Sequence, residues 1–421
     1  MGSVYKNENG AALVISLMFL AILAMLGSTA VVLTTTDMKI GANYKTSAQS
    51  FADADAGVNY ALSTMEAGLK ASPQTFTLPS TVGATSTLAY TAPSGFSFTI
   101  SDVTMTATNA YSFTSTGSGP DNAQTVLQVT FERDSAISFA AFGDSKLDTK
   151  NGGTTLSYDS QSSDPTKNDP TDPSFQTTHE ADVGSNDWLV THNGASIDGS
   201  GVLGEQADGS ATTTSIHGGT TFYGTTPVDA GRVDPDPLGV NGGGEYDPTT
   251  YADPNNDNDS IPLVEPDGEL SADSIDTNGS VTLFGKAGGS NFYLTSVVLR
   301  NGATLTIDTT AGEVNIFLTG PLDARSGSSI VLTPDPYDAT KFSIFSNSTS
   351  KIDFKNSSTV AGLIYAPYAP VDVKNSAAFY GAIWGDNVDI KNGGTVYFDT
   401  ALKDKYTSNN LTATAWQDLQ S

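Results

Sequence analysis

The chain opens with one long apolar segment. No charged residue and no proline occurs in residues 11–33, and the polar residues there are Ser16, Ser28 and Thr29. As an α-helix this segment would be about 35 Å long, which exceeds a bilayer core of about 30 Å. No other segment of the sequence is comparable. The pattern therefore predicts a single hydrophobic helix that carries a large polar head.

Three interpretations of this segment are open. It can be a plain membrane anchor. It can be a secretory signal, with Lys6 as the basic residue and a cleavage site at Ser28-Thr29-Ala30, although the apolar run is long for one and continues through residues 31–33. In the third interpretation a polar ten-residue leader is removed between Gly10 and Ala11, and the helix stays on the mature protein.

An amphipathic helix is predicted to continue to about Ala71, before Pro73 ends it. Its apolar residues recur at steps of three and four and form one stripe. The stripe consists of Ile40, Tyr44, Ala48, Phe51, Ala54, Val58, Leu62, Met65 and Leu69. Such a stripe can pack against the protein's own sheet or against helices of other chains.

Short runs with strand-like alternation follow in residues 76–142, and a Gly-Ser-Gly-Pro-Asp-Asn turn separates the last two of them. From Val281 onward a five-residue motif repeats at 352–356, 371–375 and 388–392, with weaker copies at 147–151 and 297–301. Each copy ends in Asn, a residue that accepts left-handed φ and can form a side-chain ladder. Repeats of 17 to 19 residues built from short apolar runs predict a β-solenoid.

The N-terminal residues resemble a known family. The sequence NGAALV at 9–14, Leu26-Gly27, and IGANYKTSAQSFADADAG at 40–57 are similar, in order and spacing, to the N-terminal region of PilX-like type IV pilus assembly proteins. The repeats resemble a poorly characterised β-helical domain that follows such N-termini. The resemblance implies a prepilin-type leader, cut by prepilin peptidase between Gly10 and Ala11, and a helix that crosses the inner membrane and packs on other pilin subunits.

One residue departs from the family pattern. The fifth residue of the mature chain would be Ile15, where most pilins have Glu. In the family, that carboxylate is thought to pair with the N-terminus of a neighbouring subunit. The resemblance therefore implies a minor or tip subunit, displayed on a pilus or on the cell surface.

These patterns predict a mainly β protein with one long N-terminal α-helix. We expect a leader at 1–10, a transmembrane pilin-like helix at 11–72 and a small antiparallel β region at 73–142. A β-solenoid head at 143–400 follows, with an acidic Pro/Gly-rich loop insertion at about 159–276, and residues 401–421 form a C-terminal tail.

Charge and composition narrow the functions of the head. The net charge is −27, and residues 1–72, with five acids and four bases, contribute only −1 of it. Nucleic acid and anionic lipid headgroups are therefore not expected as partners of the head. The chain has no cysteine, so disulfides and thiolate metal sites are excluded.

The acidic region contains a candidate calcium site. Residues 159–276 hold 23 acids and two bases. Within them Asp253, Asn255, Asp257 and Asp259 occupy alternate positions and Glu265 follows, similar to the ligand spacing of Ca²⁺ loops. The glycine and the final acid that such loops require are replaced by Asn258 and Val264. A solvated acidic loop is the alternative, and no cofactor other than Ca²⁺ is predicted.

No catalytic motif is supported by its context. A GxGxxG sequence at 199–204 lacks a surrounding βαβ unit, and His179, His192 and His217 share no metal-binding spacing. The row Lys355, Lys374 and Lys391 is interpreted as structural surface. We therefore predict no enzyme, but a minor or tip pilin-like subunit involved in assembly or display. The alternative is a surface adhesin or carbohydrate-binding module that uses a pilin-type anchor.

Overall fold

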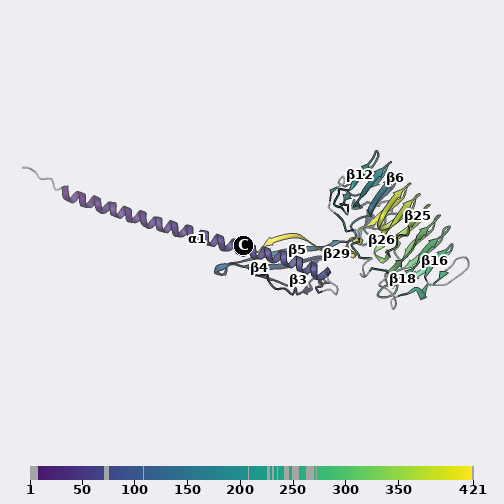
Figure 1. Ribbon diagram of the computed structural model, residues 1–421, viewed down its shortest axis with the longest axis horizontal. Coiled ribbons are helices and arrows are strands. Elements are labelled where there is room, and N and C mark those ends of the chain that lie inside the picture. Colours follow the sequence, from purple (N-terminus) through teal and green to yellow (C-terminus); the bar gives the residue numbers. More distant parts are fainter. Residues whose placement is uncertain are drawn as a thin grey trace, which may run out of the picture. The chain divides into compact units, whose positions relative to one another are not determined.

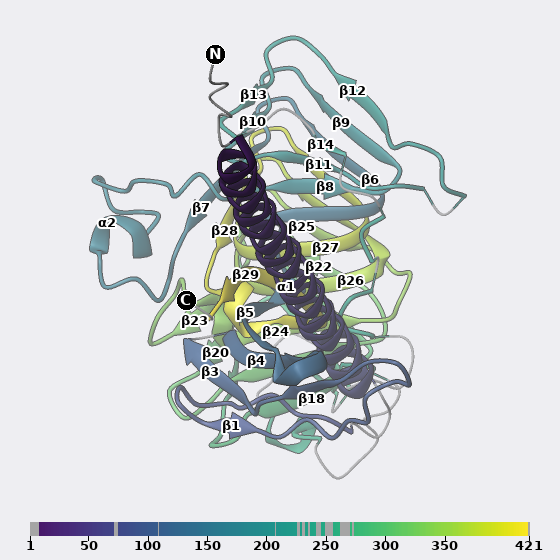
Figure 2. The same cartoon turned by 90° about the vertical axis from the view of Figure 1, so that its left-hand side faces the viewer.

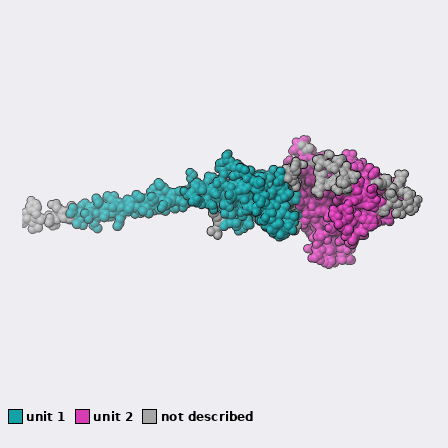
Figure 3. All heavy atoms as spheres, turned by 90° about the horizontal axis from the view of Figure 1, so that it is seen from below, with its two compact units in different colours: residues 1–134, 409–421 teal, residues 135–408 magenta. Residues whose placement is uncertain are grey.

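The structure is a computed structural model of the chain. It describes residues 8–70, 75–107, 109–206, 208–224, 228–229, 232–234, 236–240, 246–248, 256–261, 270–271 and 273–419. These residues form two compact units, one of Met1–Asp134 with Asn409–Ser421 and the other of Ser135–Ser408, coloured separately in Figure 3. The fold is mainly β with one long N-terminal helix, as predicted.

The first unit is a long helix packed on a small sheet (Figure 1). Helix α1 spans Glu8–Lys70. The sheet has the strand order β1-β3-β4-β5-β29, with β2 paired to β4. Its elements are β1 (Thr85–Ser86), β2 (Phe98–Ile100), β3 (Val103–Ala107), β4 (Ala110–Ser118), the 3-10 turn η1 (Pro120–Asn122), β5 (Gln124–Ser135) and β29 (Thr407–Asp418).

The helix and this sheet approach closely because small residues meet at their contact. A Cβ atom on Gly117 of β4 would lie 2.0 Å from the Ser50 carbonyl oxygen, so only glycine fits. Nearby, the Ser115 hydroxyl donates a 2.8 Å hydrogen bond to the Ala54 carbonyl. The apolar residues of this contact, among them Val58 and Met65, are fully buried. The sheet therefore holds only the C-terminal part of the helix.

The prediction that residues 401–421 form a tail is wrong. Residues Leu402–Lys405 form helix α3, and β29 pairs with β5 as an edge strand of the sheet. Leu411 and Ala413 of β29 pack on the core of this unit, and the Leu411 amide donates to a Glu66 carboxylate oxygen at 2.9 Å. This pairing was not evident from the sequence because β5 and β29 are separated by the whole of the second unit.

The second unit is a solenoid of parallel strands. Its first part contains β6 (Ala141–Lys150), β7 (Thr154–Tyr158), α2 (Pro165–Asn168), β8 (Val183–Ser185), β9 (Trp188–His192), β10 (Ser196–Ile197), β11 (Gly201–Leu203), β12 (Thr213–Ile216), β13 (Thr221–Phe222), β14 (Val228–Asp229), the 3-10 turn η2 (Asn258–Ser260) and β15 (Leu270–Ser271). Its second part contains β16 (Ser274–Thr277), β17 (Ser280–Phe284), β18 (Ser290–Leu294), β19 (Ser296–Leu299), β20 (Thr304–Asp308), β21 (Val314–Leu318), β22 (Leu322–Ala324), β23 (Ser329–Thr333), the 3-10 turn η3 (Ala339–Lys341), β24 (Phe342–Ser346), β25 (Ile352–Lys355), β26 (Thr359–Lys374), β27 (Ala378–Lys391) and β28 (Thr395–Asp399).

Each turn of the solenoid uses three strand directions. From β16 to β23, every strand pairs in parallel with the strand three places further along the chain. Equivalent residues therefore stack from coil to coil, as Ile364 does on Ile383. The inward-facing residues form one continuous apolar core. This core explains how a head without cysteine is stabilised.

The coils do not follow one another in chain order. Strand β27 pairs with β26 on one side and with β6 on the other, and β28 pairs with β7. The last coil of the chain thus stacks on the first, at a contact that we call the seam (Figure 1 and Figure 2). From the seam, β8 to β14 build one end of the solenoid, and β16 to β28 return from the other end.

The chain therefore enters and leaves the solenoid at the seam. The Ala136 amide donates a 2.7 Å hydrogen bond to the Tyr406 carbonyl, which holds the two connections together. Within the predicted loop insertion at about 159–276, residues 183–222 contain the short strands β8 to β13, which form coils of the solenoid. Buried Val183, Leu189 and Ile197 supply the core of these coils, while most acids lie in the turns.

Candidate functional site

The largest exposed apolar surface of the described residues is the N-terminal half of α1. It is the one described helix long and apolar enough to cross a membrane, and none of its most apolar window is buried. Leu17, Leu20 and Met25 expose 69%, 71% and 72% of their area. A soluble monomer rarely exposes an apolar patch of this extent. Residues 13–33 therefore require a lipid or protein environment.

The hydroxyl groups within this surface donate hydrogen bonds to backbone carbonyls of the same helix. The Ser16 hydroxyl donates to the Leu13 carbonyl at 2.9 Å, and the Thr29 hydroxyl donates to the Met25 carbonyl at 2.8 Å. Thr34 and Thr36 make the same contact with the carbonyls of Ala30 and Val32, one turn earlier. These bonds leave no hydroxyl donor exposed to hydrocarbon, where an unpaired one is costly.

The predicted stripe divides along the helix. Its C-terminal residues, from Ala54 onward, pack in the core of the first unit. Ile40, Tyr44 and Phe51 remain 61%, 78% and 50% exposed. The first group thus serves the protein's own sheet. The second group continues the exposed apolar surface beyond the membrane-length segment.

The predicted processing site lies at the start of this surface. Gly10 and Ala11 are inside α1, close to its first residue, Glu8. Ile15 faces outward with 58% of its area exposed. Cleavage at this bond stays a prediction, and most of the leader lies outside the described residues.

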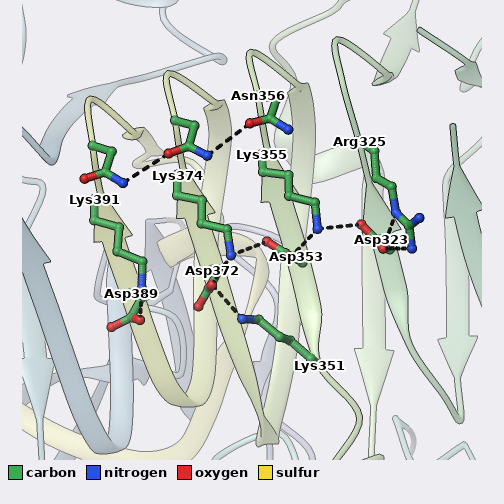
Figure 4. A network of polar contacts seen from close by, with 12 residues as sticks. Asp323, Arg325, Lys351, Asp353, Lys355, Asn356, Asp372, Lys374, Asp389 and Lys391 are labelled. Carbon is green, nitrogen blue, oxygen red and sulfur yellow. Dashed lines mark hydrogen bonds and ion pairs between the residues drawn. The ribbon is translucent and has the colours of Figure 1, made fainter. Parts of the chain in front are cut away.

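On the solenoid, one outer face carries a ladder of charges (Figure 4). Aspartates and basic residues lie on stacked strands, and Lys355 and Lys374 each pair with an aspartate of their own coil and with one of the neighbouring coil. Lys374 Nζ lies 3.0 Å from Asp353 Oδ1 and also pairs with Asp372. Lys355 lies 2.6 Å from Asp353 and 3.2 Å from Asp323. The predicted lysine row is therefore bound to its own aspartates.

The pair of Asp372 and Lys374 has shifted pKa values on both partners. Burial opposes ionisation of Asp372, but hydrogen bonds from Lys351 and Lys374 and the charges of Lys391 and Lys374 outweigh it and lower the pKa of Asp372. Burial likewise opposes ionisation of Lys374, but hydrogen bonds to Asp372 and Asp353 and their charges raise its pKa. Both shifts favour the ionised forms of Asp372 and Lys374. It offers no free cationic groove of the kind that an acidic polysaccharide would need.

A second ladder of asparagines runs along the adjacent corner, as predicted. Asn375 Nδ2 donates to Asn356 Oδ1 at 3.0 Å, and Asn392 donates to Asn375 at 3.1 Å. The ladder crosses the seam, where Asn151 donates to Asn392 at 3.2 Å, and ends with Asn193 donating to Asn151. All five residues have φ between 51° and 56°, in the left-handed region.

A third row was not anticipated from the sequence. Six aromatic side chains stack on the outside of successive strands, with ring centroids 4.2–6.3 Å apart. They are Tyr293, Phe317, Phe345, Tyr365, Trp384 and Phe142. Described parts of the acidic segment between β14 and β15 cover this row. Tyr246 contacts Phe345 at 4.5 Å, and Tyr365 donates to Asp236 at 2.8 Å.

The candidate calcium residues are only partly described. Asp253, Asn255 and Glu265 lie outside the described residues, and Asp259 is exposed. The Asp257 carboxylate, next to η2, lies 2.6 Å from Lys286 Nζ and accepts a 2.9 Å hydrogen bond from the backbone N–H of Asn291. Within the described part of the chain, no group of three or more His, Asp or Glu side chains could hold a metal ion. The calcium site stays a prediction.

The remaining motifs have structural roles. Residues 199–204 contain strand β11 and its flanking turns, so no helix follows the GxGxxG sequence. His179 binds buried Asp198 through Nδ1 and stacks on Tyr223. His192 Nε2 lies 3.8 Å from Asp148 Oδ1. His192 occupies the position at which the neighbouring coil has Lys150.

One buried carboxylate predicts a pH dependence. Asp399 accepts the amides of Ser160, Ala401 and Ala339 at 3.1–3.2 Å, but burial dominates and raises its pKa from 3.8 to about 7. Between about pH 4 and pH 7 the folded chain holds a proton that the unfolded chain has released. The unfolding free energy should therefore fall as pH rises through this window, by up to about 1.4 kcal/mol per pH unit.

Asp399→Asn should remove this part of the slope in urea titrations between pH 4.5 and 7.5. Asp308→Asn should leave the slope as it is, because hydrogen bonds from Thr310 lower the pKa of Asp308, so that this carboxylate does not take up a proton in this window. Parallel pH profiles for the wild type and Asp399→Asn would contradict the shift.

Comparisons with known proteins give separate matches for the N-terminal segment and for the solenoid. The family model described as the PilX N-terminal region matches residues 9–59, and a domain of unknown function, DUF7305, matches residues 294–405. A search of curated proteins finds no match. Among solved structures, the competence-associated pilin ComZ from Thermus thermophilus is similar at 12% identity, with 89% of this chain and 98% of that chain covered and a TM-score of 0.27.

The predicted resemblance is confirmed for the N-terminal region. Residues 9–59 are similar to the PilX N-terminal region, and the match to DUF7305 at residues 294–405 lies within the second unit. A TM-score of 0.27 does not establish a shared arrangement with ComZ.

Proposed function

We propose that this chain is a minor or tip subunit of a type IV pilus or a related filament. The observation that carries the proposal is that the PilX match covers the exposed apolar surface of α1. The PilX match ends at residue 59, and it contains the whole exposed apolar surface of α1 and the start of the buried stripe. The segment shared with the family is thus the segment that needs an external apolar partner.

The helix supports anchoring and assembly by one surface. In the inner membrane, residues 13–33 would face lipid; in a filament, the same side chains would face the helices of other pilin subunits. No charged side chain occurs between Ala11 and Thr36, so moving from one environment to the other uncovers no charge. The same helix therefore suits both states.

Ile15 and the size of the head favour a minor or tip position. Without a carboxylate at Ile15, the helix cannot neutralise the N-terminal amine of a neighbour inside an apolar bundle, where an unpaired charge is costly. The second unit, residues 135–408, is larger than the first and is inserted between β5 and β29. A subunit at the tip needs no carboxylate for a chain above it.

N-terminal processing is the first test. We expect mass spectrometry of the chain from its host to show a mature N-terminus at Ala11. Gly10→Glu should leave the full-length chain in the inner membrane and remove it from sheared filaments, because the peptidase requires a small residue before the cut.

Gly2→Glu is the matched control, since it places the same charge in the leader away from the cut, and it should be processed normally. A mature chain that begins at Val31 would indicate ordinary secretion and contradict the proposal.

The position in the filament is the second test. In filaments that contain the chain processed at Ala11, an antibody to the second unit should label tips; even labelling along the shaft would contradict the tip position.

A further inference from the structure

A pocket of about 500 Å³ opens on the outer face of the solenoid. Strands β18 and β21 form its floor, and Tyr246, the turn at Gly288 and Gly289, and the segment after α3 form its walls. Its volume lies within the range of small-molecule sites in proteins, about 300–1,000 Å³. All of its lining residues belong to the second unit.

The floor presents two side-chain amides in a fixed order. Asn291 and Asn315 occupy the same outward position on neighbouring coils, and Asn315 Nδ2 donates to Asn291 Oδ1 at 3.1 Å. This bond orients both amides, so that Asn291 Nδ2 and Asn315 Oδ1 are turned to other partners. On the next coil, β24, the residue paired with Asn315 is Ser343, whose hydroxyl forms a hydrogen bond with the Tyr406 hydroxyl. The amide pair is therefore confined to the pocket.

Aromatic rings lie directly beside these amides. Phe317 lies two residues after Asn315 and stacks on Tyr293 at 4.9 Å. Tyr246 is half-buried and contacts the rings of Phe345 and Tyr406. Their contacts with one another hold the rings in place before any ligand binds, which reduces the entropy cost of binding.

The charges in the pocket are paired. Glu313 lies 2.7 Å from Lys405 Nζ, and Lys405 also donates to the Thr340 carbonyl and lies 5.2 Å from the Tyr406 ring. The pair leaves acceptor and donor atoms at the rim, and Glu313 also lies 4.0 Å from Lys341 Nζ. The surrounding head is strongly acidic, so an anionic ligand would be repelled.

We propose that this pocket binds a neutral sugar residue of a glycan. A pyranose ring has hydroxyls that each donate and accept, matching the ordered donor and acceptor of the two amides, and a C–H face that matches the half-buried ring of Tyr246. Such pairing also provides selectivity, because a ligand that lacks the hydroxyl leaves a polar group unpaired. This inference is independent of how the helix assembles.

The test uses the full chain in lauryldimethylamine oxide, a detergent that contains no sugar. Saturation-transfer difference NMR is recorded with lactose, maltose and cellobiose as separate probes, and with sialyllactose as the acidic probe. We expect transfer to at least one neutral disaccharide. The transfer should be weaker to sialyllactose than to lactose if lactose is the disaccharide bound.

Two variants locate the binding. Asn315→Leu removes the acceptor, and Asn291→Asp keeps the size of the side chain but removes its donor. Each should weaken binding at least about tenfold. Thr306→Leu makes a polar-to-apolar change at an outward position of β20, outside the pocket, and should bind as the wild type does.

Three results would overturn the proposal: no transfer to any neutral probe, stronger transfer to sialyllactose than to lactose, or equal binding by the wild type and both amide variants. Thermal unfolding of each variant shows whether it is folded. The N-terminus at Ala11 should be unchanged in all of them, so a failure here is distinguishable from a failure of the pilin proposal.

Discussion

Trp384→Ala is expected to lower the unfolding free energy of the solenoid by about 3–5 kcal/mol. Trp384 lies on β27 with 1% of its area exposed. Its ring stacks on Phe142 of β6 at 4.2 Å and on Tyr365 of β26 at 6.0 Å. The side chain thus joins the last coil of the chain to the first. Its removal leaves a large cavity at the seam, where the strands on both sides are fixed by parallel pairing and cannot collapse into it.

Urea unfolding of the full chain, monitored by far-UV circular dichroism, measures this loss of unfolding free energy. The far-UV signal reports the strands and not the removed tryptophan. Trp188→Ala is the matched control, because Trp188 is 46% exposed at the start of β9 and should cost under about 1 kcal/mol. Hydrogen exchange adds a local readout: amides of β6 and β27 should exchange faster in Trp384→Ala than those of β20 and β23. Equal losses in the two tryptophan variants would contradict the stacking order at the seam.

The sequence predicted the elements whose causes are local. The apolar run at 11–33 identifies the helix because no charge interrupts it. The repeat ending in Asn356, Asn375 and Asn392 identifies the corner ladder, because each copy has the same apolar spacing and an Asn at a residue with positive φ. In such cases the residue itself determines the local conformation, and stacking only repeats it.

The seam was predictable in part. Residues 147–151 were recognised as a weaker copy of the repeat, and they pair with 388–391 in the register that this similarity implies. What the repeat could not show is the order of the coils. Parallel stacking is locally the same whether the neighbouring coil lies 17 or more than 200 residues away, so local patterns do not specify which coil comes next.

The pocket could not be predicted because its parts lack a common period. Asn291 and Asn315 are 24 residues apart, whereas the recognised repeats are 17 and 19 residues apart. The covering residues Tyr246 and Tyr406 come from an acidic segment and from the chain just after α3. Their role depends on contacts with the outer face, and no residue pattern within either segment indicates that they cover an aromatic row.

The other large loss of stability is expected from a substitution at Gly381. Gly381 on β27 and Gly362 on β26 are paired neighbours with φ of 134° and 130°. A side chain is strained in this region of φ, at a cost of about 1–3 kcal/mol. A Cβ on Gly381 would also lie 1.9 Å from the Gly362 carbonyl oxygen, which is backbone of the adjacent coil. That oxygen cannot move away without disrupting the parallel ladder.

Gly381→Ala is therefore expected to destabilise the solenoid by about 3 kcal/mol or more, the sum of backbone strain and an unrelieved clash. Gly279→Ala is the control, because its φ is not in the left-handed region and its nearest neighbour is the Thr277 hydroxyl at 3.7 Å. Thermal and urea unfolding of the full chain compare the two. A mild effect at Gly381 would show that β26 and β27 can separate at this corner, which the continuous pairing from Thr359 to Ala366 argues against.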